Sequence, residues 1–224
     1  MKISRLRFIG ISAAFTAFLL ALLNFPFRFA ASRSSGAEES EKLPARRLKM
    51  KQGADTVSIL KCETYNPFEV YGAIRKGLGD IGFKIRSGSS VLLKPNILAQ
   101  NTPDQCTTTH PAVVEAVCRI FSDHKCRITI GESSAFYQGG GTRKGFVTSG
   151  IGAVAERYGA ELLPFEATRL RKITGGNALD PFYITEAVFS YDLVVNLPKM
   201  KVHQLAGLSG AIKNLYGCIP GGTK

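Results

Sequence analysis

Hydrophobic residues along this chain fall into short runs that end in polar clusters. The runs Ser89–Leu93, Cys126–Ile130 and Tyr191–Val195 have the length and β-branched content of buried strands. Between these runs, apolar residues recur at the three- and four-residue spacing of amphipathic helices. Strands that alternate with helices are typical of β-α-β crossovers. The sequence therefore predicts an α/β fold with a largely parallel sheet and flanking helices.

Turn and capping residues set the predicted boundaries of these elements. Asn66-Pro67 opens one helix and Thr109-His110-Pro111 opens a second. A third helix is predicted over Lys144–Tyr158, with Gly159 as its end. Strands are predicted within the apolar runs at Ser90–Leu93, Arg127–Ile130 and Leu193–Leu197. The remaining elements are strands at Val57–Cys62 and Glu161–Phe165, and a short turn or helix at Phe182–Ile184.

The N-terminal residues have the pattern of an export or anchoring segment. Basic residues precede an apolar run, Phe8–Phe27, that is close to the roughly 20 residues needed to span a bilayer. Ser35-Gly36-Ala37 supplies the small residues of a cleavage site. We interpret residues 1–37 as a signal peptide or membrane anchor, 38–52 as a basic linker and 53–224 as the α/β domain. This predicts an extracytoplasmic protein, either membrane-anchored or secreted, that contacts the membrane if the segment stays uncleaved.

Charge and cysteine content narrow the function classes. The net charge is +12, but residues 1–52 hold 10 basic and 3 acidic residues, which leaves 19 and 14 for the rest. No basic stripe with interleaved aromatic residues follows, so nucleic acid is not an expected partner. The five cysteines form no C-x-x-C pair and their number is odd. The sequence therefore predicts no zinc ribbon, no ferredoxin-type cluster and no complete disulfide framework.

The polar clusters are expected to share one site, because ligands of parallel sheets bind beyond the carboxyl ends of the strands. Lysines in such a position hold carboxylates or phosphates, and imidazoles transfer protons. Free amides at a helix N-terminus also favour an anion. We predict a cationic pocket for a small anionic ligand, with binding residues Lys94, Asn96, Thr109, Ser133, Lys199, Lys201, Lys213 and Asn214. His110 and His203 are the predicted catalytic residues. A metal site of these two histidines with Glu132 stays open as an alternative, and no metal is assigned.

Several of these stretches together resemble a known bacterial and archaeal family, called domain of unknown function 362. The resemblance covers roughly residues 57–224 and rests on Val91–Asn96, Thr108–Pro111, Gly131–Ser134, Asn196–His203 and Ser209–Gly217. Relatives are commonly described as iron–sulfur proteins, because many add a ferredoxin-like cysteine segment that is not seen here. They also usually continue well beyond the last stretch. The resemblance thus implies a fragment whose sheet is incomplete at the C-terminus.

A fainter similarity links His203–Gly210, Lys213 and Pro220-Gly221 to the nickel-pincer lactate racemases, and it hints at a small carboxylate as ligand. Taken together, the residues favour an uncharacterised enzyme that acts on a small anionic substrate. An iron–sulfur-associated redox or accessory protein and a non-catalytic anion-binding module are the alternatives. No cofactor is assigned.

Overall fold

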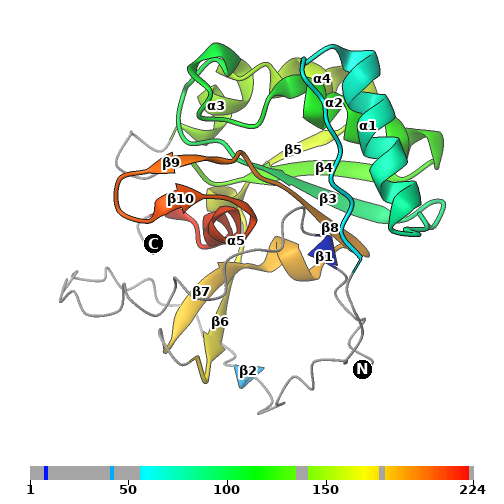
Figure 1. The fold of residues 1–224 in the computed structure, drawn as a ribbon. Helices are drawn as coiled ribbons and strands as arrows, with labels where there is room; N and C mark the ends of the chain where they lie inside the picture. The colour runs from blue at the N-terminus through cyan, green and yellow to red at the C-terminus, as the bar shows by residue number, and fades with distance from the viewer. Residues whose placement is uncertain (1–7, 10–40, 43–55, 135–140, 177–179, 222–224) are drawn as a thin grey trace.

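A parallel sheet forms the centre of the fold (Figure 1). The computed structural model describes residues 8–9, 41–42, 56–134, 141–176 and 180–221. Among these, the strands lie in the order β1-β8-β3-β4-β5, and every neighbouring pair is parallel. The prediction of an α/β fold with a largely parallel sheet is confirmed. The strands are β1 (Phe8–Ile9), β8 (Leu193–Leu197), β3 (Ser90–Pro95), β4 (Arg127–Glu132) and β5 (Glu161–Pro164).

Helices connect these strands and pack together over the sheet. α1 (Pro67–Asp80) packs against α2 (Pro111–Asp123), which in turn packs against α4 (Ile151–Tyr158). Both predicted starts are confirmed. Asn66 caps α1 by accepting hydrogen bonds from its first amides, and His110 is the N-cap of α2. The amide of Thr109, just before this cap, donates to the Asn96 carbonyl at 2.9 Å, which places the start of α2 beside the carboxyl end of β3.

Alternate residues of the central strands face opposite sides of the sheet. Val91 and Leu93 of β3 pack with the apolar residues of α2 and α4, whereas Leu92 packs with Phe165 and Val188 on the other side. All five side chains are buried. A strand that is buried on both faces has a continuous apolar sequence, and this is why β3 could be identified from its sequence.

Short elements cover the second face and the carboxyl edge. β6 (Leu170–Thr174) and β7 (Phe182–Thr185) are antiparallel, with the two-residue β2 (Glu41–Lys42) beside β6. β9 (Lys201–His203) and β10 (Gly207–Ser209) form a hairpin that leads into α5 (Ala211–Leu215) (Figure 1). The hairpin and α5 follow β8 directly, and they bring the lysine-rich segment back over the sheet edge.

Three predicted elements were wrong. Residues 57–62 form no strand. Their backbone pairs with no strand among the residues that the structure describes, and Ile59 is 91% exposed. The helix predicted over residues 144–158 is two helices, α3 (Thr142–Thr148) and α4, because Gly150 between them has a left-handed φ of 77°. Residues 182–184 are part of β7 rather than a turn or helix.

No helix in the described part of the chain is long and apolar enough to cross a bilayer. Apart from Phe8 and Ile9, the apolar run and the small residues at 35–37 lie outside the described residues. The segment boundaries at 37 and 52 therefore stay predictions.

Candidate functional site

The carboxyl ends of β3, β4 and β8 bring four polar side chains into contact. This buried polar cluster consists of Lys94, Glu132, Asn196 and Asn214. The Lys94 ammonium lies 2.7 Å from Glu132 Oε2 and 3.4 Å from Asn214 Oδ1. Asn214 Nδ2 donates to Asn196 Oδ1 at 2.7 Å. The cluster thus ties α5 to the ends of three strands that are far apart in the sequence.

The ion pair within this cluster is shielded from water. Lys94 is 0% exposed and Glu132 is 2% exposed. Glu132 also accepts hydrogen bonds from the backbone amides of Ile97 at 3.3 Å and Ser133 at 2.8 Å. A buried pair with such additional hydrogen bonds can offset the cost of desolvating both charges. The structure therefore places the predicted binding residue Lys94 inside the protein, with its charge balanced by Glu132.

Gly217 closes the buried polar cluster from the α5 side. A Cβ at this position would lie 2.4 Å from Glu132 Oε1 and 2.8 Å from Lys94 Nζ. Only a residue without a side chain leaves room for the ion pair.

Outside the buried polar cluster lies a group of basic residues, Lys199, Lys201, His203 and Lys213, which we call the lysine cluster. Lys201 Nζ donates to the backbone carbonyl of Thr107, and Lys199 Nζ donates to the Tyr65 hydroxyl at 2.8 Å. Within the described residues, Lys213 forms no hydrogen bond or ion pair. The sequence contains no Asp or Glu from residue 193 to residue 224. Among the described residues no acidic side chain forms an ion pair with these lysines, and Glu132, which acts on Lys201 from nearby, is already paired with Lys94.

Burial is the largest cause of the pKa shifts in the lysine cluster, and repulsion from neighbouring lysines is the second cause for Lys201 and His203. Burial, followed by the nearby Lys213 ammonium, lowers the pKa of Lys201 to about 8, although Glu132 acts in the opposite direction and Lys199 adds to the lowering. Burial also lowers the pKa of Lys213. The pKa of His203 is lowered by burial and then by Lys213 and Lys201. An anion bound among these groups would oppose every one of these shifts.

Both predicted catalytic histidines use Nδ1 as a hydrogen-bond acceptor. His110 Nδ1 accepts from the amide of Ala112 at 3.2 Å, and His203 Nδ1 accepts from the amides of Leu205 and Ala206, both at 3.2 Å. Burial, and then the charge of Lys199, lowers the pKa of His110. We infer neutral imidazoles with the proton on Nε2. In that state each Nε2 can donate a hydrogen bond but cannot accept a proton.

The residues at the start of α2 have different roles. Thr109 Oγ1 donates to the Leu197 carbonyl at 2.6 Å and accepts from the Asn96 amide at 2.8 Å, so this predicted binding residue holds α2 to β8 and β3. Thr108 Oγ1 is buried and has no hydrogen-bond partner within the described residues. The Tyr65 ring stacks on His110 with 3.8 Å between ring centroids. Lys199 and His110 thereby contact the same tyrosine, Lys199 at its hydroxyl and His110 at its ring.

Ser133 lies in a neighbouring network rather than in the lysine cluster. Its hydroxyl donates to Glu166 Oε1 at 2.9 Å, and Thr142 donates to the same oxygen at 2.7 Å. Glu166 and Thr142 also line a shallow pocket of about 390 Å³, together with Arg143 and Lys144. Its mixed charge makes it a weaker anion site than the lysine cluster.

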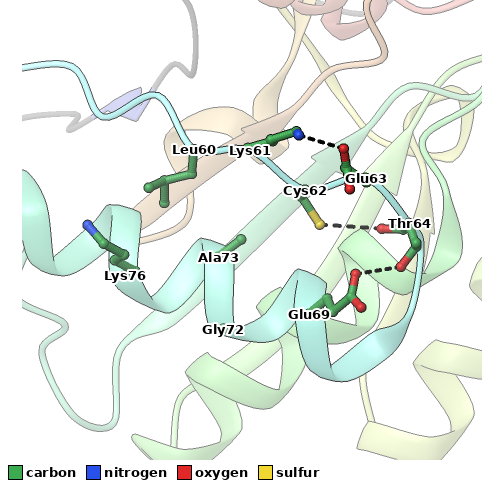
Figure 2. Close-up of a pocket in the computed structure, with 9 residues that line it drawn as sticks. All are labelled: Leu60, Lys61, Cys62, Glu63, Thr64, Glu69, Gly72, Ala73 and Lys76. Atoms are coloured by element: carbon green, nitrogen blue, oxygen red, sulfur yellow. Dashed lines mark hydrogen bonds and ion pairs between the residues drawn. The ribbon is translucent and has the colours of Figure 1, made fainter.

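A larger hollow of about 510 Å³ lies between residues 60–64 and α1 (Figure 2). Its charged groups are satisfied locally: Lys61 pairs with Glu63 at 2.6 Å, and Glu69 accepts from Thr64 at 2.6 Å. Both partners of the ion pair are highly exposed, so their attraction is screened by water. Neither of these two pockets includes a residue of the lysine cluster. We nevertheless place the candidate site at the lysine cluster, because its basic residues have no acidic partner of this kind.

The sequence did not predict the structural roles of several residues in this region. Glu132 was considered only as a metal ligand, and its pairing with Lys94 across 38 residues has no local sequence signal. Tyr65 and Thr108 were not predicted to have a role. Asn214 was predicted as a binding residue, and its amide instead connects strand ends within the buried polar cluster. The described residues contain no group of three His, Cys, Asp or Glu side chains that could hold a metal ion, so the metal alternative has no structural support.

Comparisons with known proteins place the chain among uncharacterised relatives. The family model described as domain of unknown function (DUF362) matches residues 91–224. The thylakoid-associated protein sll1697 of Synechocystis sp. is 29% identical over 172 residues, which are 75% of this chain and 52% of that protein. The chain thus spans about half the length of this curated relative. No solved structure matches the chain.

Proposed function

Since this chain belongs to the domain of unknown function 362 family, we propose that its carboxyl-edge site binds a small anion, a carboxylate or a phosphate, through the lysine cluster. The observation that carries the proposal is Lys201, whose ammonium is partly buried beside two further lysines with no acidic residue in the same segment. Burying uncompensated cations costs stability, and a bound anion removes that cost.

The histidines add hydrogen-bond donors to this region. His203 belongs to the lysine cluster, and His110 stacks on Tyr65, whose hydroxyl accepts from Lys199. As neutral imidazoles they can each donate from Nε2 to a ligand oxygen.

If the bound anion is a substrate, Lys201 is our candidate for proton transfer. A group with a pKa of about 8 exchanges protons efficiently near neutral pH. The two histidines would then bind and orient the substrate, in contrast to the catalytic role that the sequence suggested. A non-catalytic anion-binding module would use the same contacts without the proton transfer.

We also propose that the protein acts at a membrane, on the extracytoplasmic side. The apolar run Phe8–Phe27 supports this location, as does a relative named as thylakoid-associated. Fractionation of the tagged full chain tests it, and recovery of the full-length protein in the soluble cytoplasm contradicts it.

The binding proposal is tested by calorimetric titration of inorganic phosphate and of lactate into the wild type and three variants. Lys201→Ala and Lys213→Ala remove desolvated cations and should each weaken binding by about 2–5 kcal/mol. Lys84→Ala, an exposed lysine outside the site, is the matched control and should cost about 0–1 kcal/mol. Equal effects at all three positions would place the ligand elsewhere. Binding of neither anion to the wild type would refute the proposed ligand class.

A further inference from the structure

Tyr65 contacts two residues of the region in which we place the anion. Its ring lies nearly parallel to the His110 imidazole, with 9° between the two planes and 3.8 Å between the ring centroids. Its hydroxyl accepts a hydrogen bond from Lys199 Nζ at 2.8 Å, and the same ammonium lies 5.3 Å from the centroid of the tyrosine ring. One side chain therefore contacts both a predicted catalytic histidine and a member of the lysine cluster.

Local hydrogen bonds hold the residues on both sides of Tyr65. Asn66 is the N-cap of α1, and its side chain accepts from the first amides of that helix. Thr64 Oγ1 accepts from the Asn66 amide at 3.1 Å and donates to Glu69 Oε2 at 2.6 Å. Contacts of this kind satisfy the free amides at the start of a helix and stabilise it. The position of Tyr65 is therefore set by the start of α1.

The imidazole that stacks on Tyr65 is held from a second side by its own helix. His110 is the N-cap of α2, and its Nδ1 accepts from the Ala112 amide at 3.2 Å. Because this contact uses Nδ1, the proton of the neutral ring is on Nε2, which has no partner among the described residues. Lys199 is close enough for its charge to lower the pKa of His110, as the second cause after burial. Tyr65 thus holds a neutral donor and a charged donor near each other.

We propose that Tyr65 is a positioning residue of the anion site, which holds Lys199 by its hydroxyl and His110 by its ring so that both can donate to one bound anion. This inference rests on the anion site proposed above. A lysine loses rotamer freedom when it binds a ligand, and a contact that restricts it beforehand reduces this cost. Since the ammonium has three protons and gives one to the tyrosine hydroxyl, two remain for the anion.

Histidine NMR of the full chain reports both contacts without any ligand. The sequence has three histidines, and His124, exposed at the other end of α2, is an internal control whose titration should not change in any variant. Tyr65→Leu should abolish the ring-current shift of the His110 signals, whereas Tyr65→Phe should keep it. Lys199→Met should raise the pKa of His110, because a nearby positive charge is removed. The same substitution in Tyr65→Phe should raise it by less, because the lysine has already lost its hydrogen bond.

Calorimetric titration of lactate tests what this positioning does for binding. Tyr65→Phe should weaken lactate binding by about three- to tenfold, the range expected for one hydrogen bond. Tyr71→Phe is the matched control, since the Tyr71 hydroxyl donates to Asp123 at 3.4 Å and the Arg119 guanidinium lies 4.3 Å from its ring centroid. This control should change the affinity by less than about twofold.

Three results would overturn the role of Tyr65 and leave the anion site intact, provided that the wild type binds lactate. They are a His110 ring-current shift that survives Tyr65→Leu, an equal effect of Lys199→Met with and without the tyrosine hydroxyl, and lactate binding by Tyr65→Phe that is as tight as that of the wild type or tighter. A wild type that binds neither lactate nor phosphate would refute the anion site itself, and with it the role of Tyr65 there.

Discussion

Removing both charges of the Lys94–Glu132 ion pair together should destabilise the fold by far less than the sum of the two single removals. The two side chains are 0% and 2% exposed, and their charged atoms lie 2.7 Å apart. At an effective dielectric constant of about 20, two unit charges at this distance attract by about 6 kcal/mol. Desolvation costs several kcal/mol for each ion, so the pair as a whole contributes little net stability.

The single substitutions leave one buried charge without its partner. We expect Lys94→Met and Glu132→Gln each to lower the free energy of unfolding by about 3–5 kcal/mol. Glu132→Gln keeps one oxygen that can still accept from the Ile97 amide, so most of its cost comes from the lost charge. The double variant should cost about as much as one single variant, because neither charge remains. The coupling energy would then be about 3 kcal/mol.

These four proteins, the wild type, both single variants and the double variant, form a double-mutant cycle. Urea unfolding of each of them measures the coupling energy. The slope of free energy against urea should stay constant, so that changes in midpoint report stability. Additive effects, or single variants that each cost less than about 1 kcal/mol, would show that water reaches the pair. The buried polar cluster would then not hold α5 to the sheet.

Three further predictions follow from the same contacts. Gly217→Ala should lower the midpoint of thermal unfolding, because its Cβ would lie 2.4 Å from Glu132 Oε1. Gly72→Ala, on the open surface of α1, is the control and should raise the free energy of unfolding by about 0.5–1 kcal/mol. An unchanged midpoint for Gly217→Ala would contradict the close packing. Lactate affinity should be constant well below pH 8 and fall as the pH rises through 8, because Lys201, with a pKa of about 8, loses its proton while the charge of lactate stays the same; titrations that give equal affinities at pH 6 and pH 9.5 would contradict this. Thiol labelling mapped by mass spectrometry should modify the exposed Cys106 quickly in the native protein. It should modify Cys118 only after unfolding, because burial raises the pKa of that thiol to about 12; rapid native labelling of Cys118 would contradict its burial.

The elements that the sequence predicted well are those whose signal is local. β3 and β8 are continuous apolar runs because both faces are covered, and α1 begins at an Asn-Pro pair whose side chain caps it. The elements that it missed depend on distant partners. β6 and β7 carry mixed, half-exposed side chains and gain strand geometry from pairing with each other and, for β6, with β2. Residues 57–62 lack such a partner within the described part of the chain.

The residues of the site also divide into those with a local sequence signal and those that depend on distant partners. The parallel order of the strands was enough to predict that the polar clusters gather at one edge of the sheet. It could not reveal that Lys94 turns inward to Glu132, because the two residues are joined only by the register of β3 and β4. Nor could the sequence show that Lys201 and Val202 point to opposite faces of the β9–β10 hairpin, because residues 200–208 contain no continuous strand signal. The pairing of Val202 with Leu208 defines these faces.

The most direct test of the anion site is a measurement of the pKa of Lys201. NMR of a protein isotopically labelled at the lysine side chains gives this pKa. In the free protein we expect a value near 8, set by burial and by the neighbouring lysines. Lys201→Arg identifies the resonance by its disappearance. Saturation with phosphate or lactate should raise the pKa, because a bound anion stabilises the ammonium. A pKa near that of an ordinary lysine in the free protein, or one that neither anion moves, would contradict the claim that this edge of the sheet is an anion-binding site.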